Sequence, residues 1–143
     1  MATTTFSGPI KAGTIRQGAS ENLGFTLMAQ SAVIDIIGAT NTSTIGIIPA
    51  NSQIVDVILN VTTVANDSGT ATVQVGNAGD TDEYLPATNV KALATTRGTI
   101  QTEGTDIGAS DQTVTATFTA ANGDGTTGAA TVTVLYIQNN NLS

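Results

Sequence analysis

Carboxylates are the side chains of this sequence best suited to chemistry, and one short run concentrates them. In Asp80-Thr81-Asp82-Glu83, acids separated by one residue offer oxygen atoms of the kind that bind Ca²⁺. The run lacks the glycine-centred loop of an EF-hand, and charged side chains commonly face water. We therefore interpret it as a solvated turn between strands and assign no metal site to it.

Two glycine-containing segments are also compatible with ligand binding. Asn122-Gly123-Asp124-Gly125 is similar in composition to calcium-binding repeats, but those act as tandem arrays, and a single copy indicates a hairpin turn. Gly76-Asn77-Ala78-Gly79 follows a predicted strand, yet it opens no helix and lacks the Lys-Ser/Thr of a phosphate loop. Neither segment predicts a cofactor site.

Catalytic groups are scarce. The chain contains no histidine, the usual general base, and no cysteine nucleophile. Lys11 and Lys91 belong to no motif that would pair either of them with a serine. Two carboxylates of the glycosidase type require a cleft lined by aromatic rings, whereas this chain has two tyrosines and no tryptophan. We predict that the protein is not an enzyme, and we assign no catalytic, cofactor-binding or metal-binding residue.

The elements that would position any site are predicted to be strands. Threonine occurs 27 times, and its branched, stiff side chain suits a pleated sheet. Hydrophobic residues make up 40% of the chain but aromatic residues only 3%, so the core must consist mainly of small aliphatic side chains. The few aromatic residues are predicted to be core or interface anchors: Phe6, Phe25, Tyr84, Phe118 and Tyr136.

Alternation with a period of two residues is the clearest pattern in the chain. Residues 113–120 place Val114, Ala116 and Phe118 on one face and a row of threonines on the other, and residues 130–136 repeat the pattern. The Asn-Gly-Asp-Gly segment between them predicts a C-terminal antiparallel hairpin. The same reasoning predicts a second hairpin, formed by strands at 55–61 and 71–75 and a turn at 66–69.

Shorter strands are predicted elsewhere, at 25–29, 32–37, 44–48 and 98–103. Residues 77–97 are predicted to contain a polar loop, in which 88–95 forms either a strand or one helical turn. Many short strands in 143 residues predict an all-β, single-domain antiparallel β-sandwich or jelly roll over residues 21–143. Residues 1–20 have weak periodicity and predict an extended N-terminal arm.

Charge restricts the partners. The net charge is −7, and the four cations Lys11, Arg16, Lys91 and Arg97 are too few and too scattered to neutralise a phosphate backbone. An anionic membrane surface would repel the chain, so we predict neither nucleic-acid nor membrane binding. The N-terminus has neither the cationic nor the apolar region of a secretory signal, which predicts synthesis in the cytoplasm and leaves release by cell lysis open.

The central third of the chain resembles small structural proteins of tailed bacteriophages. The resemblance covers roughly residues 44–86: Ile48-Pro49-Ala50, then TATVQVG at 70–76, then GDTDEYL at 79–85. It implies a jelly-roll capsid decoration (cement) protein, a class whose members commonly form trimers over the gaps between capsomers. The implied partner is the major capsid protein, the implied assembly a homotrimer, and the implied location the outer capsid surface of the virion.

Two other functions remain compatible with the sequence. A different virion part, such as a head fibre, tail or baseplate component, fits the same composition, although no coiled-coil or collagen-like shaft segment is present. A carbohydrate-binding β-sandwich belongs to another class, and the scarcity of aromatic residues disfavours it.

Overall fold

The computed structural model describes residues 27–99 and 107–138, which contain eight β-strands and no helix. The strands are β1 (Leu27–Asp35), β2 (Asn41–Ile48), β3 (Ser52–Thr63), β4 (Ala71–Gly76), β5 (Leu85–Asn89), β6 (Thr95–Arg97), β7 (Gln112–Ala120) and β8 (Ala129–Gln138). The predicted arm at 1–20 lies outside the described residues and stays a prediction.

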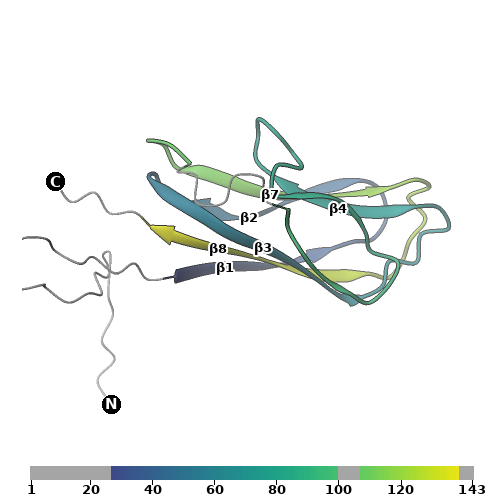
Figure 1. Cartoon of the computed structure of the whole chain (residues 1–143). Helices are drawn as coiled ribbons and strands as arrows, with labels where there is room; N and C mark the ends of the chain where they lie inside the picture. The colour runs from purple at the N-terminus through teal and green to yellow at the C-terminus, as the bar shows by residue number, and fades with distance from the viewer. Residues whose placement is uncertain (1–26, 100–106, 139–143) are drawn as a thin grey trace, which may run out of the picture.

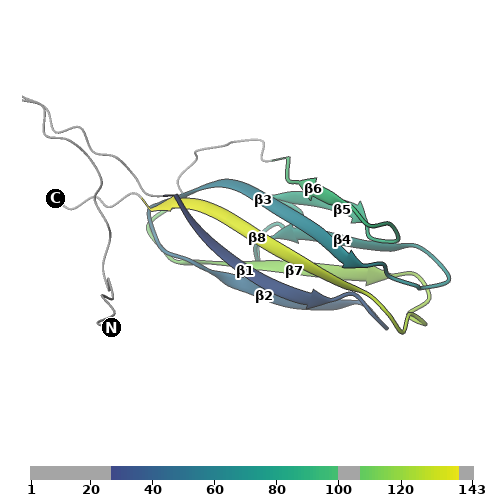
Figure 2. The same ribbon diagram turned by 90° about the horizontal axis from the view of Figure 1, so that it is seen from below.

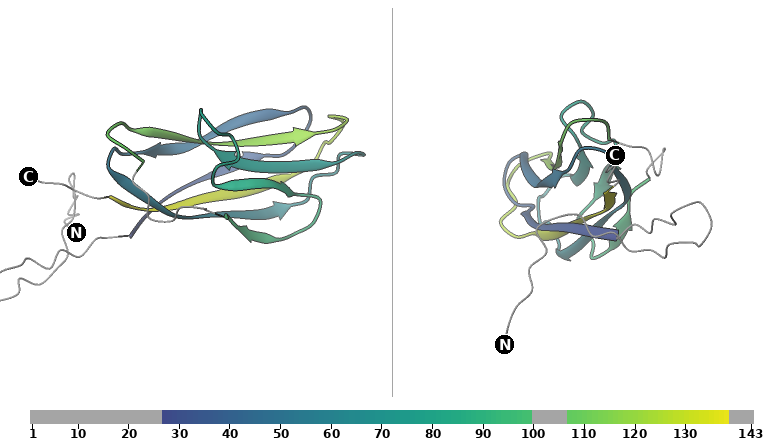
Figure 3. Two further views of the ribbon diagram at one scale, coloured as in Figure 1. Left: turned by 45° about the horizontal axis from the view of Figure 1, so that its top comes forward. Right: turned by 90° about the vertical axis from the view of Figure 1, so that its left-hand side faces the viewer.

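The strands form two four-stranded antiparallel sheets. The first sheet has the order β1-β8-β3-β6 and the second the order β2-β7-β4-β5. The sheets lie one over the other (Figure 1), and the end-on view in Figure 3 shows their strands surrounding a common interior. The predicted all-β sandwich is confirmed.

The pairing is nested along the chain. β1 pairs with β8, β2 with β7, β3 with β6 and β4 with β5, so the outermost strands in sequence meet and the innermost meet. Additional pairings of β3 with β8 and of β4 with β7 join these pairs into the two sheets. This strand order is that of a jelly roll, in which most connections cross from one sheet to the other.

Both predicted hairpins are wrong because of these crossings. β7 and β8 lie in different sheets, and so do β3 and β4, as Figure 2 shows. The residues expected to make tight turns, at 122–125 and 66–69, instead belong to loops that connect one sheet to the other. Among the described strands, only β4 and β5 are both consecutive and paired.

Individual strands also differ from their predictions. The strands expected at 25–29 and 32–37 are joined within β1, which continues through Gln30 and Ser31. The region 77–97, predicted to contain a polar loop and a strand or helical turn at 88–95, contains two strands; the end of β5 and the start of β6 lie within 88–95. The predicted strand at 98–103 lies mostly outside the described residues.

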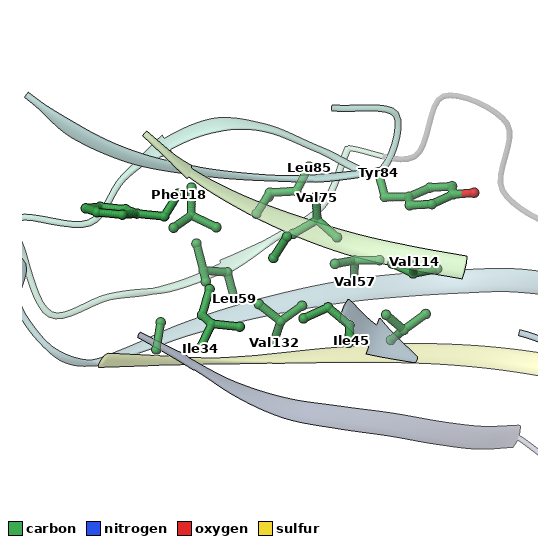
Figure 4. Close-up of a cluster of buried hydrophobic side chains, with 14 of the residues drawn as sticks. Ile34, Ile45, Val57, Leu59, Val75, Tyr84, Leu85, Val114, Phe118 and Val132 are labelled. Atoms are coloured by element: carbon green, nitrogen blue, oxygen red, sulfur yellow. The ribbon is translucent and has the colours of Figure 1, made fainter. Parts of the chain in front are cut away.

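The predicted inward faces of β7 and β8 are confirmed. Val114, Ala116 and Phe118 are buried, as are the alternate residues of β8 from Ala130 to Tyr136. They meet aliphatic residues such as Leu59 in one interior, which Figure 4 shows between the two sheets. The core is therefore mainly aliphatic, as the composition requires.

A bulge in β3 changes which residues face inward. Ile54 pairs with Tyr136 and Asp56 with Leu135, which leaves Val55 as the additional residue between them. Ile54 consequently points into the core together with Val57. In the strand predicted at 55–61, a strict period of two would put Val55 on the same face as Val57, because periodicity alone cannot locate a bulge.

The sandwich is closed along one side by Gln30 of β1. Its Nε2 donates to the carbonyl of Ile47 in β2 at 2.8 Å, and also to the hydroxyl of Tyr136 at 3.4 Å. A Cβ on Gly46 would collide with the Gln30 side-chain amide, so a larger residue at this position would require the Gln30 side chain to move.

Replacing Phe118, the largest fully buried side chain, tests the core. We expect Phe118→Ala to lower the free energy of unfolding by about 3–5 kcal/mol, because it removes buried apolar contacts and leaves a cavity. The control Thr117→Ala changes the adjacent outward residue and should cost less than about 1 kcal/mol. Urea unfolding measures both, and equal losses would contradict the assigned faces.

Candidate functional site

The acidic run lies in an exposed turn between β4 and β5. The turn is organised by Asn77, whose Oδ1 accepts from the backbone N–H of Gly79 at 2.7 Å and of Asp80 at 3.0 Å. Asp80 Oδ1 in turn accepts from the N–H of Asp82 at 3.3 Å. The polar groups therefore stabilise the turn, and within residues 27–99 and 107–138 no cluster of three or more acids suitable for a metal ion is found.

The two aspartates of this turn influence each other. A hydrogen bond between their carboxyl groups lowers the pKa of Asp80 and raises the pKa of Asp82, whose ionisation the negative charge of Asp80 also opposes. Both groups are exposed, so this coupling is a property of a solvated turn. It provides no acid–base pair held inside a cleft.

Tyr84 connects the same turn to the sandwich through hydrogen bonds of its hydroxyl group. Its ring is buried, its hydroxyl donates to Gln112 Oε1 at 2.9 Å, and it accepts from Asn77 Nδ2 at 3.3 Å. Burial raises the pKa of the phenol. A Cβ on Gly76 would collide with the carbonyl of Asp80, so the glycine predicted not to form a phosphate loop instead permits close packing of the turn.

The opposite end of the sandwich is where β1, β3, β5 and β7 finish, and we call it the crossover end. Asp124 links two of its loops, because Oδ1 accepts from the backbone N–H of Ser68 at 2.8 Å and Oδ2 from the Ser68 hydroxyl at 2.6 Å. Asn66 Oδ1 accepts from the N–H groups of Thr126 and Thr127 at 2.7 and 2.9 Å. The Asn-Gly-Asp-Gly segment therefore joins loops and uses its carboxylate for that purpose.

Lys91 forms hydrogen bonds with a loop at the crossover end. Its Nζ donates to the carbonyls of Asp67 at 2.7 Å and Gly69 at 2.6 Å. The lysine considered for a Ser–Lys pair is thus held by main-chain oxygens. Lys11, the other candidate, lies outside the described residues.

The outer face of the second sheet is a threonine array. Thr42 stands opposite Thr117 and Thr44 opposite Thr115, and the hydroxyls of the first pair lie 3.0 Å apart. β4 continues the array with Thr72 opposite Thr119. The face predicted from the alternation in 113–120 is confirmed, and it offers many hydroxyls that can donate or accept.

The outer face of the first sheet differs chemically. Leu27 and Val33 of β1 are 54% and 72% exposed, unusually so for large aliphatic side chains in a strand. In β8, Ile137 lies opposite Leu27 and Leu135 lies opposite Ala29, and both β8 residues are half-buried. The alternation at the end of β8 had marked these residues as outward but gave no reason to single out the face.

Two charged groups of the first sheet, Asp56 and Arg97, form an ion pair. Arg97 of β6 donates through Nε to Asp56 Oδ2 at 2.7 Å, and its Nη2 contacts the same oxygen. Sequence reasoning did not predict this pair, because the residues are far apart in sequence and Arg97 lay in a stretch expected to be loop. The contact covers Asp56, which is buried although it lies on the outer face.

Of the aromatic residues predicted to be anchors, Tyr84, Phe118 and Tyr136 are buried in the core. Phe6 and Phe25 lie outside the described residues. Residues 27–99 and 107–138 contain no helix that is long and apolar enough to cross a membrane.

Comparison with known proteins identifies the fold. No protein-family model and no curated protein sequence matches the chain. Among solved structures, a chain in the acidic stable capsid of Helicobacter pylori bacteriophage KHP30 aligns with a TM-score of 0.60 and 16% identity, covering 90% of this chain and 91% of that one. A chain of the cyanophage Pam1 capsid asymmetric unit aligns with a TM-score of 0.58 and 18% identity, covering 96% and 99%.

A third similar chain comes from the capsid of Ralstonia phage GP4, with a TM-score of 0.50 and 17% identity, covering 90% of this chain and 92% of that one. At these identities the likeness establishes a shared fold. It extends over nearly the whole of each chain, so the sandwich described here is similar to complete chains of phage capsid structures.

Removing the carboxylate of Asp124 tests the crossover end. The Ser68 hydroxyl, followed by the Ser68 N–H, lowers the pKa of Asp124 below its ordinary value of 3.8. The stabilisation is therefore present above that value and is lost as the pH falls through the folded-state pKa. We expect Asp124→Ala to lower the thermal unfolding midpoint at neutral pH, with a difference from wild type that narrows below about pH 4.

The matched control is Asp35→Ala, which removes the same charge from an exposed position of β1. For this control, the thermal unfolding midpoint should differ from that of wild type by nearly the same amount at every acidic pH. If both variants behave alike, the bonds to Ser68 do not stabilise the fold.

Tyr84→Phe tests the attachment of the acidic turn. Loss of the hydroxyl leaves Gln112 and Asn77 without this partner and should cost about 0.5–1.5 kcal/mol at neutral pH. The raised pKa of Tyr84 means that wild type loses stability as the pH rises above the ordinary value of 10.0, because the unfolded chain releases the proton first. The variant has no phenol to ionise, so the difference in unfolding free energy between wild type and Tyr84→Phe should become smaller at alkaline pH.

The control Gln74→Ala removes a bond to Thr81 in the same turn without touching the phenol. Chemical denaturation at a series of alkaline pH values measures all three proteins. A gap that stays constant for Tyr84→Phe would show that the phenol does not titrate differently in the folded state.

Proposed function

We propose that this chain is a structural protein of a bacteriophage virion, and that within the virion it decorates and cements the capsid. The observation that carries the proposal is the whole-chain likeness to three phage capsid structures, which covers at least 90% of this chain in each case. The residue pattern at 44–86 supports the same class independently.

The proposed mechanism is mechanical. A decoration protein bridges neighbouring major capsid proteins on the outer surface. The bridge helps the shell to resist internal pressure only if the bridging protein is itself rigid. Hydrogen bonds between loops at the crossover end and Tyr84 near the other end support such rigidity. Copies of the protein would act as a homotrimer over the gaps between capsid proteins.

The chemistry of the chain agrees with a role that needs no catalysis. Histidine and cysteine are absent from the sequence, and the polar groups singled out as chemical candidates are used within turns and loops. The net charge of −7 suits a protein on the outside of a particle, where it opposes aggregation between particles.

Binding to capsids tests the proposal. We expect the purified protein to co-sediment with capsids that lack it, in a saturable manner, and to raise the temperature at which those capsids release their contents. Free capsid subunits serve as the control and should not bind, because a bridging site exists only where neighbouring subunits meet.

Two results would contradict the decoration role. Absence of co-sedimentation at concentrations well above the expected site concentration would remove it. Immunogold labelling of complete virions at the tail or baseplate, with none on the shell, would assign the protein to another virion part.

A further inference from the structure

The outer face of the first sheet carries an apolar patch at the end opposite the crossover end. We define the apolar patch as Leu27, Ala29, Leu135 and Ile137. The register places Leu27 opposite Ile137 and Ala29 opposite Leu135, so these side chains are neighbours on one face. Exposed aliphatic residues gathered in this way on a sheet commonly mark an interface.

The strand that borders the apolar patch has an unprotected edge. β1 is an edge strand of nine residues, without proline or lysine. The other three edge strands of the described sheets are blunted: β6 has three residues, β5 contains Pro86, and β2 is bulged near Gly46 and crossed by Gln30. Proteins usually protect edges in such ways, so an unprotected long edge next to an apolar face points to a protein partner.

Charge indicates which partner fits. Among the described residues, carboxylates far outnumber the cations Lys91 and Arg97. Two copies of this chain that met through their turns or loops would bring like charges together. The apolar patch has no charged member, and the nearest carboxylate across β8, Asp56, is paired with Arg97. The exposed carboxylate of β1 itself, Asp35, lies at the other end of the strand, so one copy can approach another through the apolar patch with little repulsion.

We propose that the apolar patch and the edge of β1 form the contact between copies of this chain. A closed symmetric assembly uses the same surface in every copy, and one axis beside β1 brings the patches of neighbouring copies together. The threonine array of the second sheet then remains on the outside of the oligomer. This inference rests on the proposed virion function for the role of the oligomer, but the contact itself is testable on the purified protein.

Charge insertion is the first test. Leu27→Glu and Ala29→Glu each place a carboxylate in the apolar patch and should raise the dissociation constant of the oligomer by roughly 100-fold or more. Ile47→Glu and Leu93→Glu are matched controls, because these residues are 55% and 68% exposed and lie on the second sheet and in a loop. All four variants change the net charge equally, and analytical ultracentrifugation should show dissociation only for the first two.

Thiol labelling is the second test, and the cysteine-free sequence makes it direct. In Ala29→Cys, the thiol should react with a maleimide rapidly in dilute protein and slowly in concentrated protein, because association covers it. In the control Ile47→Cys, the rate should be independent of protein concentration.

Each alternative occupant gives a different result, and each would overturn the proposal. Protection at position 29 that is independent of concentration would mean that the chain covers its own patch. Protection only on capsids would assign the patch to the capsid surface. A wild-type protein that is monomeric at every concentration would also refute the contact, whereas capsid binding by the same sample would leave the proposed virion function intact.

Discussion

The nested pairing of distant strands is the constraint on which this structure depends. Because β1 meets β8 and β2 meets β7, the sheets close only when strands from both ends of the described chain come together. Apart from the connection between β4 and β5, which pair with each other, the connections between consecutive described strands then cross from one sheet to the other. Such crossings lack the ladder bonds of a hairpin, so their backbone groups take partners from other loops, as when the Gly38 N–H donates to the Gly125 carbonyl, and from side chains.

The polar residues at the crossover end provide those partners. Asp124 binds Ser68, Asn66 binds the N–H groups of Thr126 and Thr127, and Lys91 binds main-chain carbonyls. Residue types that elsewhere coordinate metals or take part in catalysis are here used to tie loops together. The same holds for Asn77 and Tyr84 near the acidic turn. The hydrogen-bonding groups of these residues are thus used within the fold.

Sequence reasoning succeeded where the physical signal is local. The alternation in β7 and β8 identifies inward residues correctly, from Phe118 to Tyr136, because each strand reports its own two faces. It failed where the signal is non-local. The Asn-Gly-Asp-Gly segment has the composition of a hairpin turn, and nothing near it in sequence shows that β7 pairs with β2 and β4. The bulge at Val55 and the Asp56–Arg97 pair likewise depend on partners that only the folded sheet brings together.

The two outer faces of the sandwich differ chemically, because the second sheet carries threonine hydroxyls and the first sheet carries an apolar patch. Hydroxyls on the second sheet can exchange hydrogen bonds with water at little cost, so that face is stable when exposed. Leucine and isoleucine on the first sheet gain free energy only when another surface covers them, at roughly 25 cal/mol per Å² of apolar area. In the proposed oligomer the first face would be covered and the second would stay exposed, so each face would meet the surroundings that suit its chemistry.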